Sequence, residues 1–198
     1  GRWGGPLSYY DPQTGEKKAY YRIFGDGSCY TLAHLEGHGL MAVGTSVNGG
    51  SGTRPKVDQA VLFLWDYVAE EKVWEGTLDR PVSVYNALVV GPDGRLYGTV
   101  TGGEAPGELF AFDPEMRAFR ERIPLPSGKP LDLGLQNGPH GRICGFTSSC
   151  LYRFDPGTLA MEVLAREDDA FRVAGPIVGD SIYFATGHRL RAATIPQA

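Results

Sequence analysis

Short apolar runs alternate with tight turns rich in Gly, Pro and Asp along most of the chain. The clearest example is Gly91–Pro114, GPDGRLYGTVTGGEAPGELFAFDP, which predicts a turn, a strand, a loop, a second strand and another turn. The segment Gly138–Pro156, GPHGRICGFTSSCLYRFDP, repeats this pattern with a shorter loop. No apolar stretch of useful length has the 3.6-residue period of a helix, so the repeat predicts an all-β fold.

An aspartate ends the third strand of each predicted unit and marks the period of the repeat. Asp11, Asp66, Asp113 and Asp155 recur at intervals of about 40–55 residues. A carboxylate at this position starts a turn well, because it can accept hydrogen bonds from backbone N–H groups ahead of it. Four antiparallel strands in a unit of this size are typical of a β-propeller blade.

We therefore predict a β-propeller of four-stranded antiparallel blades, built as one array through the whole chain. The predicted units are a partial blade at 1–24, complete blades at 28–78, 83–125 and 130–166, and a partial blade at 171–196. The last unit lacks a fourth strand and the first unit lacks two inner strands. The array could close as a four-bladed ring in one chain, as an eight-bladed ring of two chains, or as part of a longer propeller. A surplus third strand at Leu7–Asp11 favours the two-chain or multi-part propeller.

Two motifs carry a resemblance to known families. GPDGRLYG at Gly91–Gly98 and ELFAFDP at Glu108–Pro114, echoed by CLYRFDP at Cys150–Pro156, resemble the blades of β-propeller repeat families. These are the PQQ-like, kelch-like, NHL and SMP-30/gluconolactonase-type propellers. The resemblance implies the fold over nearly the whole chain. It transfers no functional residue, because the tryptophan docking pattern of PQQ enzymes is absent and no SMP-30-type metal triad can be assigned.

Composition and charge exclude several function classes. Lys+Arg 19 against Asp+Glu 23, without a basic block, argues against a nucleic-acid partner. No apolar run approaches the roughly 20 residues of a membrane span, so no membrane partner is expected. Cys29, Cys144 and Cys150 have no zinc or redox spacing and are expected to be buried. We expect no metal and no cofactor, and for the location we lean to secreted or extracytoplasmic.

The long or polar connections are predicted to gather on one face of the ring, which we call the loop-rich face. They are Val47–Gln59, Asp79–Ser83, Gly102–Gly107, Pro126–Pro130 and Glu167–Ala170. The tight Gly-Pro and Asp-Pro turns fall on the opposite face. Because binding residues concentrate on loops that a rigid scaffold holds in place, we expect the functional site on the loop-rich face.

Polar side chains near the starts of the innermost strands, and in the insertion after Val47, are candidate ligand-binding residues. They are Tyr30, Asn48, Arg54, Asn86 and Asp132. Together they offer the flat apolar surface, donors and acceptors that a sugar or a carboxylate ligand needs. The alternative is that these residues only fill the central channel and hydrogen-bond to one another.

These observations favour a non-catalytic binding or scaffold module for a carbohydrate, a peptide or a partner protein. A second hypothesis is a polysaccharide-active lyase or hydrolase, or a domain of one. Its catalytic candidates, by residue type alone, are Tyr85, His188 and Arg172. This hypothesis predicts that the three side chains meet within hydrogen-bond reach at a cleft. A third hypothesis is assembly, in which the incomplete blade joins a homo-oligomer or a second propeller-forming chain.

Overall fold

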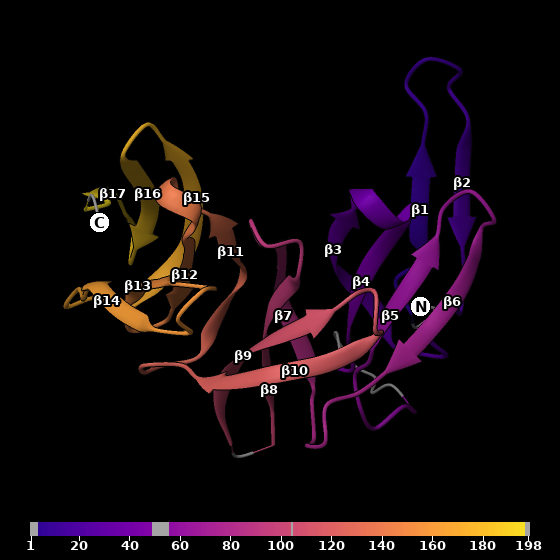
Figure 1. Cartoon of the computed structure of the whole chain (residues 1–198), viewed down its shortest axis with the longest axis horizontal. Coiled ribbons are helices and arrows are strands. Elements are labelled where there is room, and N and C mark those ends of the chain that lie inside the picture. The colour runs from indigo at the N-terminus through magenta and orange to yellow at the C-terminus, as the bar shows by residue number, and fades with distance from the viewer. Residues whose placement is uncertain (1–3, 49–55, 104, 197–198) are drawn as a thin grey trace.

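The protein folds into successive antiparallel sheets placed around an open arc (Figure 1). This computed structural model describes residues 4–48, 56–103 and 105–196. The first strand of each complete sheet lies nearest the centre of the arc, and the later strands lie progressively further out. This arrangement is that of propeller blades, so the predicted fold class is confirmed. Among the described residues the only helical segments are two short 3-10 turns, and no helix could span a membrane.

Three blades have four strands each. The first blade comprises β3 (Ser28–Leu35), β4 (Leu40–Ser46), β5 (Leu62–Asp66) and β6 (Glu71–Gly76). The second blade comprises β7 (Val84–Val90), β8 (Leu96–Gly102), β9 (Ala105–Asp113) and β10 (Ala118–Pro124). The third blade comprises β11 (Pro130–Asn137), β12 (Ile143–Thr147), β13 (Leu151–Phe154) and β14 (Met161–Ala165). A single bridge between Ser46 and Val84 links the first two blades.

An incomplete sheet lies at each end of the arc (Figure 1). At one end β1 (Leu7–Tyr10) and β2 (Lys17–Tyr20) form a hairpin. At the other end β15 (Phe171–Val178), β16 (Ser181–Thr186) and β17 (Arg189–Thr194) form a three-stranded sheet. Within the described part of the chain, β17 pairs only with β16 and β1 pairs only with β2. The described strands therefore do not close into a four-bladed ring.

The aspartate at the end of each third strand builds the same turn in all four units. Its Oδ1 accepts a hydrogen bond from a backbone N–H two or three residues ahead, at 2.8–2.9 Å, in every case. The residue four positions after each aspartate has a positive φ; these residues are Gly15, Glu70, Arg117 and Leu159. The repeat seen in the sequence is therefore also a repeat of backbone conformation, which three non-glycine residues adopt despite its cost.

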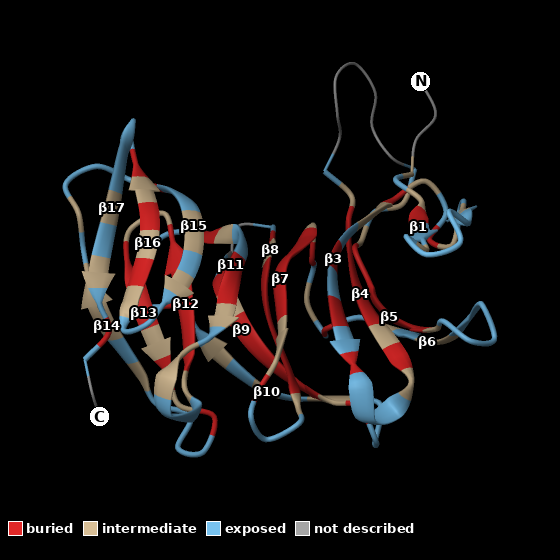
Figure 2. Cartoon of the chain, turned by 90° about the horizontal axis from the view of Figure 1, so that it is seen from above, coloured by how far each residue is buried: buried red, intermediate tan, exposed pale blue. Residues whose placement is uncertain are grey.

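Apolar side chains are buried mainly between consecutive sheets. Tyr97 of the second blade lies against Phe154 of the third, with ring centroids 5.5 Å apart. Phe146 of the third blade lies against Phe184 of the C-terminal sheet at 5.7 Å. Figure 2 shows the buried positions on the sheets inside the arc and growing exposure toward β17. Each blade thus covers one face of the next and supports a rigid row of inner strands.

The three cysteines are free thiols. Cys144 and Cys150 are buried and Cys29 is half-buried. Burial raises the pKa of Cys29 and of Cys144 to about 11. Cys144 and Cys150 therefore act as small core residues, as expected, whereas Cys29 is only partly buried.

Candidate functional site

Each inner strand has a bulge near its start. The register with the second strand of the sheet shifts around Tyr30 in β3, Asn86 in β7 and Arg172 in β15. In β11 the irregular stretch is wider and contains Asp132, followed by Leu133 with φ 55°. A bulge takes a residue out of the ladder and re-aims its side chain, and bulges are common beside functional sites. Four polar residues thus leave their sheets at the same end of successive inner strands.

Three of these residues form a hydrogen-bonded group, which we call the inner-strand cluster: Tyr30, Asn86 and Asp132. The hydroxyl of Tyr30 donates to Oδ2 of Asp132 at 2.6 Å, and Nδ2 of Asn86 donates to Oδ1 at 2.8 Å. The hydroxyl of Thr101 donates to Oδ1 of Asn86 at 3.2 Å. The bond to the Asp132 carboxylate, together with partial burial, raises the pKa of Tyr30 to about 12. One carboxylate therefore joins inner strands of three blades.

A polar pocket of about 400 Å³ adjoins the inner-strand cluster. Thr101 belongs to both, because it lines the pocket and also bonds to Asn86. The rest of the lining comes from the connections after β4, β6 and β10, including Asn48, Ser83 and Lys129, and from the end of β8, the turn after it and the start of β9. Four of the five connections expected on the loop-rich face thus meet around one pocket.

Arg80 fixes one wall of this pocket. Its side chain is 8% exposed and donates hydrogen bonds to the carbonyl oxygens of Gly102 at 2.9 Å and Pro106 at 3.2 Å. It also forms an ion pair with Glu108 at 3.0 Å. Burial by itself would raise the pKa of Glu108, but hydrogen bonds from arginine side chains, Arg80 among them, lower it. A Cβ on Gly102 would lie 2.4 Å from the carbonyl oxygen of Pro81, so only glycine allows the two loops to approach this closely.

The structure brings together most of the predicted ligand-binding residues. Tyr30, Asn86 and Asp132 form the cluster, and Asn48 lies in the adjoining pocket. Arg54 lies outside the described residues. The exposed fraction is 43% for Tyr30 and 5% for Asn86, and Asp132 is exposed. The cluster therefore presents a tyrosine and a carboxylate to solvent above a buried amide.

The three catalytic candidates are not brought together. Tyr85 is fully buried between the first and second blades, and its ring meets Phe110 edge-on at 5.6 Å. Burial raises the pKa of its hydroxyl, and the nearby backbone groups of Leu62 and Leu78 offset this only in part, since no partner of full hydrogen-bond geometry lies in the described structure. Arg172 and His188 are exposed on the C-terminal sheet, in the β15 bulge and in the turn after β16. The convergence that the enzyme hypothesis requires is absent among these described residues.

Sequence analysis did not single out Thr101 or Arg80. The sequence placed Thr101 at the end of a strand that runs into a glycine-rich loop, and Arg80 in a connection on the expected face. Their partners lie 15 to 28 residues away on other elements. The sequence therefore indicated only that Thr101 and Arg80 lie at the loop-rich face. Their hydrogen-bond and ion-pair partners became apparent only from the fold.

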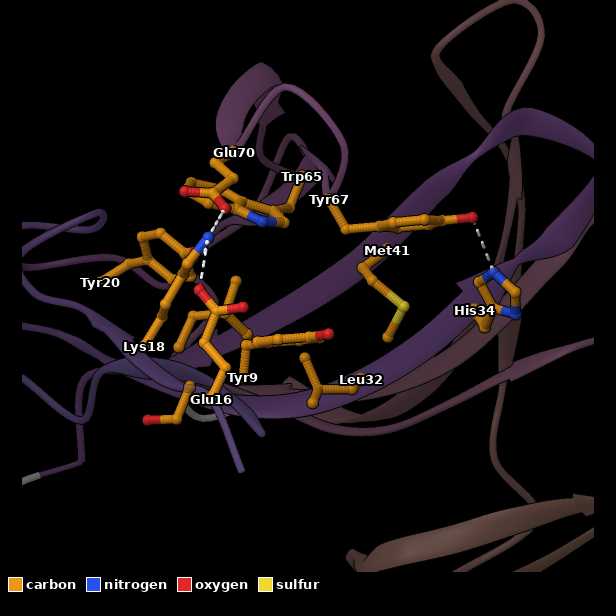
Figure 3. Close-up of a pocket in the computed structure, with 12 residues that line it drawn as sticks. Tyr9, Glu16, Lys18, Tyr20, Leu32, His34, Met41, Trp65, Tyr67 and Glu70 are labelled. Atoms are coloured by element: carbon orange, nitrogen blue, oxygen red, sulfur yellow. Dashed lines mark hydrogen bonds and ion pairs between the residues drawn. The ribbon is translucent and has the colours of Figure 1, made fainter. Parts of the chain in front are cut away.

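A second hollow, which we call the hairpin groove, lies between the β1–β2 hairpin and the outward face of the first blade (Figure 3). Its volume is about 580 Å³. Aromatic side chains line it from both sides, and they include Tyr9, Trp65 and Tyr67. Leu32 and His34 of β3 form part of its wall. Across residues 4–48, 56–103 and 105–196, no group of three or more His, Cys, Asp or Glu side chains is placed to hold a metal ion.

Comparison with known proteins shows the fold only. No protein-family model and no curated protein sequence matches the chain. The crystal structure of RRP9 WD40 repeats matches with a TM-score of 0.71 and 9% identity, over 97% of this chain and 55% of that one. The extracellular domain of the putative hybrid two component system BT4673 from B. thetaiotaomicron matches with a TM-score of 0.69 and 14% identity, over 96% and 26%. The chain therefore spans about half of the first structure and about a quarter of the second.

Proposed function

We propose that the chain is a propeller-type binding module that holds a carbohydrate at the inner-strand cluster and the pocket beside it. The observation that carries this proposal is the Asp132 carboxylate, held by Tyr30 and Asn86 from two other inner strands. Two blades thus orient a carboxylate that is still exposed. Preorganised polar groups of this kind determine orientation and specificity in ligand pockets.

The chemistry of the cluster suits a hydroxyl-rich ligand. A carboxylate has about four acceptor positions, so Asp132 can accept hydroxyl donors beyond its two internal bonds. The exposed ring of Tyr30 offers a flat apolar surface for the C–H face of a sugar. Asn48 and Lys129 add polar groups from the pocket, and exposed Arg172 adds donors on the neighbouring inner strand. A sugar that carries a carboxylate, such as a uronate, would use the arginine as well.

A peptide or partner protein at the same face is the second candidate, because four separate connections present backbone there.

We propose binding without catalysis, since the hydroxyl of Tyr85 is buried away from the pocket. We also propose that the open arc is completed by another propeller-forming chain. Among propellers, membership of the PQQ-like, kelch-like, NHL or SMP-30-like families stays a prediction.

The test is binding of the labelled protein to an array of neutral and uronate-containing oligosaccharides. Asp132→Ala should weaken binding at least tenfold, because it removes the acceptor and releases both donors. The matched control is Asp180→Ala, which removes an exposed carboxylate from the tight turn after β15 on the opposite face. Equal binding by both variants would refute the site. Binding to a peptide library but to no oligosaccharide would refute the carbohydrate class and favour the second candidate.

A further inference from the structure

Leu133 of the inner strand β11 is both exposed and strained. Its side chain is 69% exposed, and its φ of 55° lies in the left-handed region, which is unfavourable for a residue with a Cβ. Among the described residues, no other non-glycine residue with a positive φ lies inside a strand. Strained backbone of this kind is concentrated at ligand sites, where the surrounding structure maintains it.

The strain arises from an excursion of the chain at residues 131–134. Between the paired positions Pro130 and Leu135, β11 advances five residues while β12 advances two. A Cβ on Gly134 would lie 2.8 Å from the carbonyl oxygen of Leu131, so glycine is needed where the chain passes this close to itself. The left-handed conformation nevertheless falls on Leu133 and not on this glycine.

The neighbouring leucines of β11 are used for packing, and Leu133 is not. Leu131 packs against the apolar core between the third blade and the C-terminal sheet. Leu135 is 7% exposed and belongs to the core shared with the second blade. A regular strand would turn all three leucines to one face. The excursion instead directs the outer two into cores on opposite sides of the blade and leaves Leu133 in solvent.

Leu133 and Asp132 reach solvent at the same place. β11 lies between β7 of the second blade and β15 of the C-terminal sheet (Figure 1). Because blades lie on both sides of this strand, two successive exposed residues in it face the channel mouth. This exposure is set by the described neighbours of β11 and not by residues beyond either end of the chain.

An apolar side chain beside a carboxylate matches the two ends of an acetamido group. The N–H of that group can donate to Asp132, because each carboxylate oxygen accepts only one hydrogen bond from the described side chains. Its methyl group can pack on the exposed side chain of Leu133. A hydroxyl at the same position of the sugar would use Asp132 but leave Leu133 in water.

We propose that the inner-strand cluster selects sugars that carry an acetamido group, with Asp132 accepting its N–H and Leu133 contacting its methyl group. This inference rests on the carbohydrate site proposed above and names the substituent that the site recognises. Leu133 is thus a specificity-determining residue, and its strained backbone holds an apolar side chain where the core cannot take it up.

The test is isothermal titration calorimetry with a chito-oligosaccharide and a cello-oligosaccharide of equal length. Both are β-1,4-linked, and they differ only in carrying an acetamido group or a hydroxyl at C2. We expect the acetylated chain to bind at least about tenfold more tightly, since it adds one hydrogen bond and one buried methyl group.

Substitutions at Leu133 separate its side chain from its backbone strain. Leu133→Gly removes both, so the affinity for the acetylated chain should fall about fivefold to tenfold while the Tm does not fall. The affinity for the cello-oligosaccharide should not change. Leu133→Met keeps an apolar side chain and should keep most of the selectivity. The matched control is Leu159→Gly, at a left-handed leucine with φ 61° in a tight turn on the opposite face, which should alter neither affinity.

Three results would overturn this inference alone: equal affinity for the two oligosaccharides, selectivity that survives Leu133→Gly, or a lower Tm in that variant, which would show that the side chain packs against the fold. In each case Asp132→Ala would still weaken binding, so the carbohydrate site would stand. If no oligosaccharide binds the unaltered protein, the proposed function fails and this inference fails with it.

Discussion

The buried tyrosines of this propeller should respond to the same substitution with opposite signs. Tyr85 and Tyr97 are both fully buried, but only the hydroxyl of Tyr97 has a partner, Oδ2 of Asp93 at 2.7 Å. The hydroxyl of Tyr152 has none in the described structure. The hydroxyl of Tyr85 has no partner of full hydrogen-bond geometry either, but backbone groups of Leu62 and Leu78 lie near enough to lower the pKa that burial raises. Replacement by phenylalanine keeps the ring and its contacts and removes only the oxygen.

The magnitudes follow from these environments. Burying a hydroxyl without a hydrogen bond costs about 1–3 kcal/mol in proteins, so Tyr152→Phe should raise the free energy of unfolding by up to that amount. Tyr85→Phe should raise it by less, because backbone groups of Leu62 and Leu78 interact with its hydroxyl. Tyr97→Phe loses a hydrogen bond to a charged acceptor, worth about 1.5–3 kcal/mol, and should therefore lower the free energy of unfolding. In a chain of this size about 1 kcal/mol shifts Tm by roughly 2–4 °C. Tyr152→Phe and Tyr97→Phe should therefore melt on opposite sides of the unaltered protein.

The assay is thermal and urea unfolding followed by circular dichroism at one fixed protein concentration, because any assembly makes Tm concentration-dependent. Tyr152→Phe should raise Tm at least as much as Tyr85→Phe does. If Tyr85→Phe lowers Tm as much as Tyr97→Phe does, its hydroxyl has a stabilising partner and the reasoning fails. Such a result would also reopen Tyr85 as a functional residue.

Two further predictions concern the cluster and the repeat. Asp132→Asn removes the anion beside Tyr30, so the pKa of Tyr30 should fall from about 12 toward 10. This pKa can be measured from the absorbance at 295 nm, as the difference between each protein and the same protein carrying Tyr30→Phe. An unchanged titration of Tyr30 would contradict its hydrogen bond to Asp132. Because the folded pKa is the higher one, this bond stabilises the fold fully below pH 10, and that contribution is lost as pH rises toward 12. Leu159→Gly relieves a left-handed residue with φ 61° and should stabilise the protein by about 0.5–1 kcal/mol in urea unfolding, whereas Gly15→Ala at the equivalent position should do the reverse.

The fold could be predicted because local turn chemistry repeats. Each Asp-centred turn depends on hydrogen bonds within a few residues. The ends of the strands at Asp113 and Asp155 can therefore be predicted from the local sequence, without information on distant contacts. The order of the blades then follows from the order of the repeats.

For the candidate site, the sequence predicted which face of the propeller it occupies, but not which side chains meet there. Tyr85 and Asn86 are neighbours in sequence, and a strand turns alternate residues to opposite faces, so a shift of one residue decides which of them reaches the axis. The bulge in β7 makes that choice: it re-aims Asn86 and leaves Tyr85 in the core. Bulges come from long-range pairing with the second strand, so the sequence of β7 alone cannot show them.

The four bulges also make this scaffold easy to re-engineer. A residue that has left the ladder contributes little to strand pairing, so substitutions there should change the chemistry of the channel mouth while the blades stay intact. Tyr30, Asp132 and Arg172 are exposed, so side chains of different sizes should fit there, while the buried Asn86 donates a hydrogen bond to Asp132. Varying these positions together would give a library of binding surfaces on one β-propeller scaffold, comparable to a small antibody paratope. Each blade would contribute one residue to the specificity.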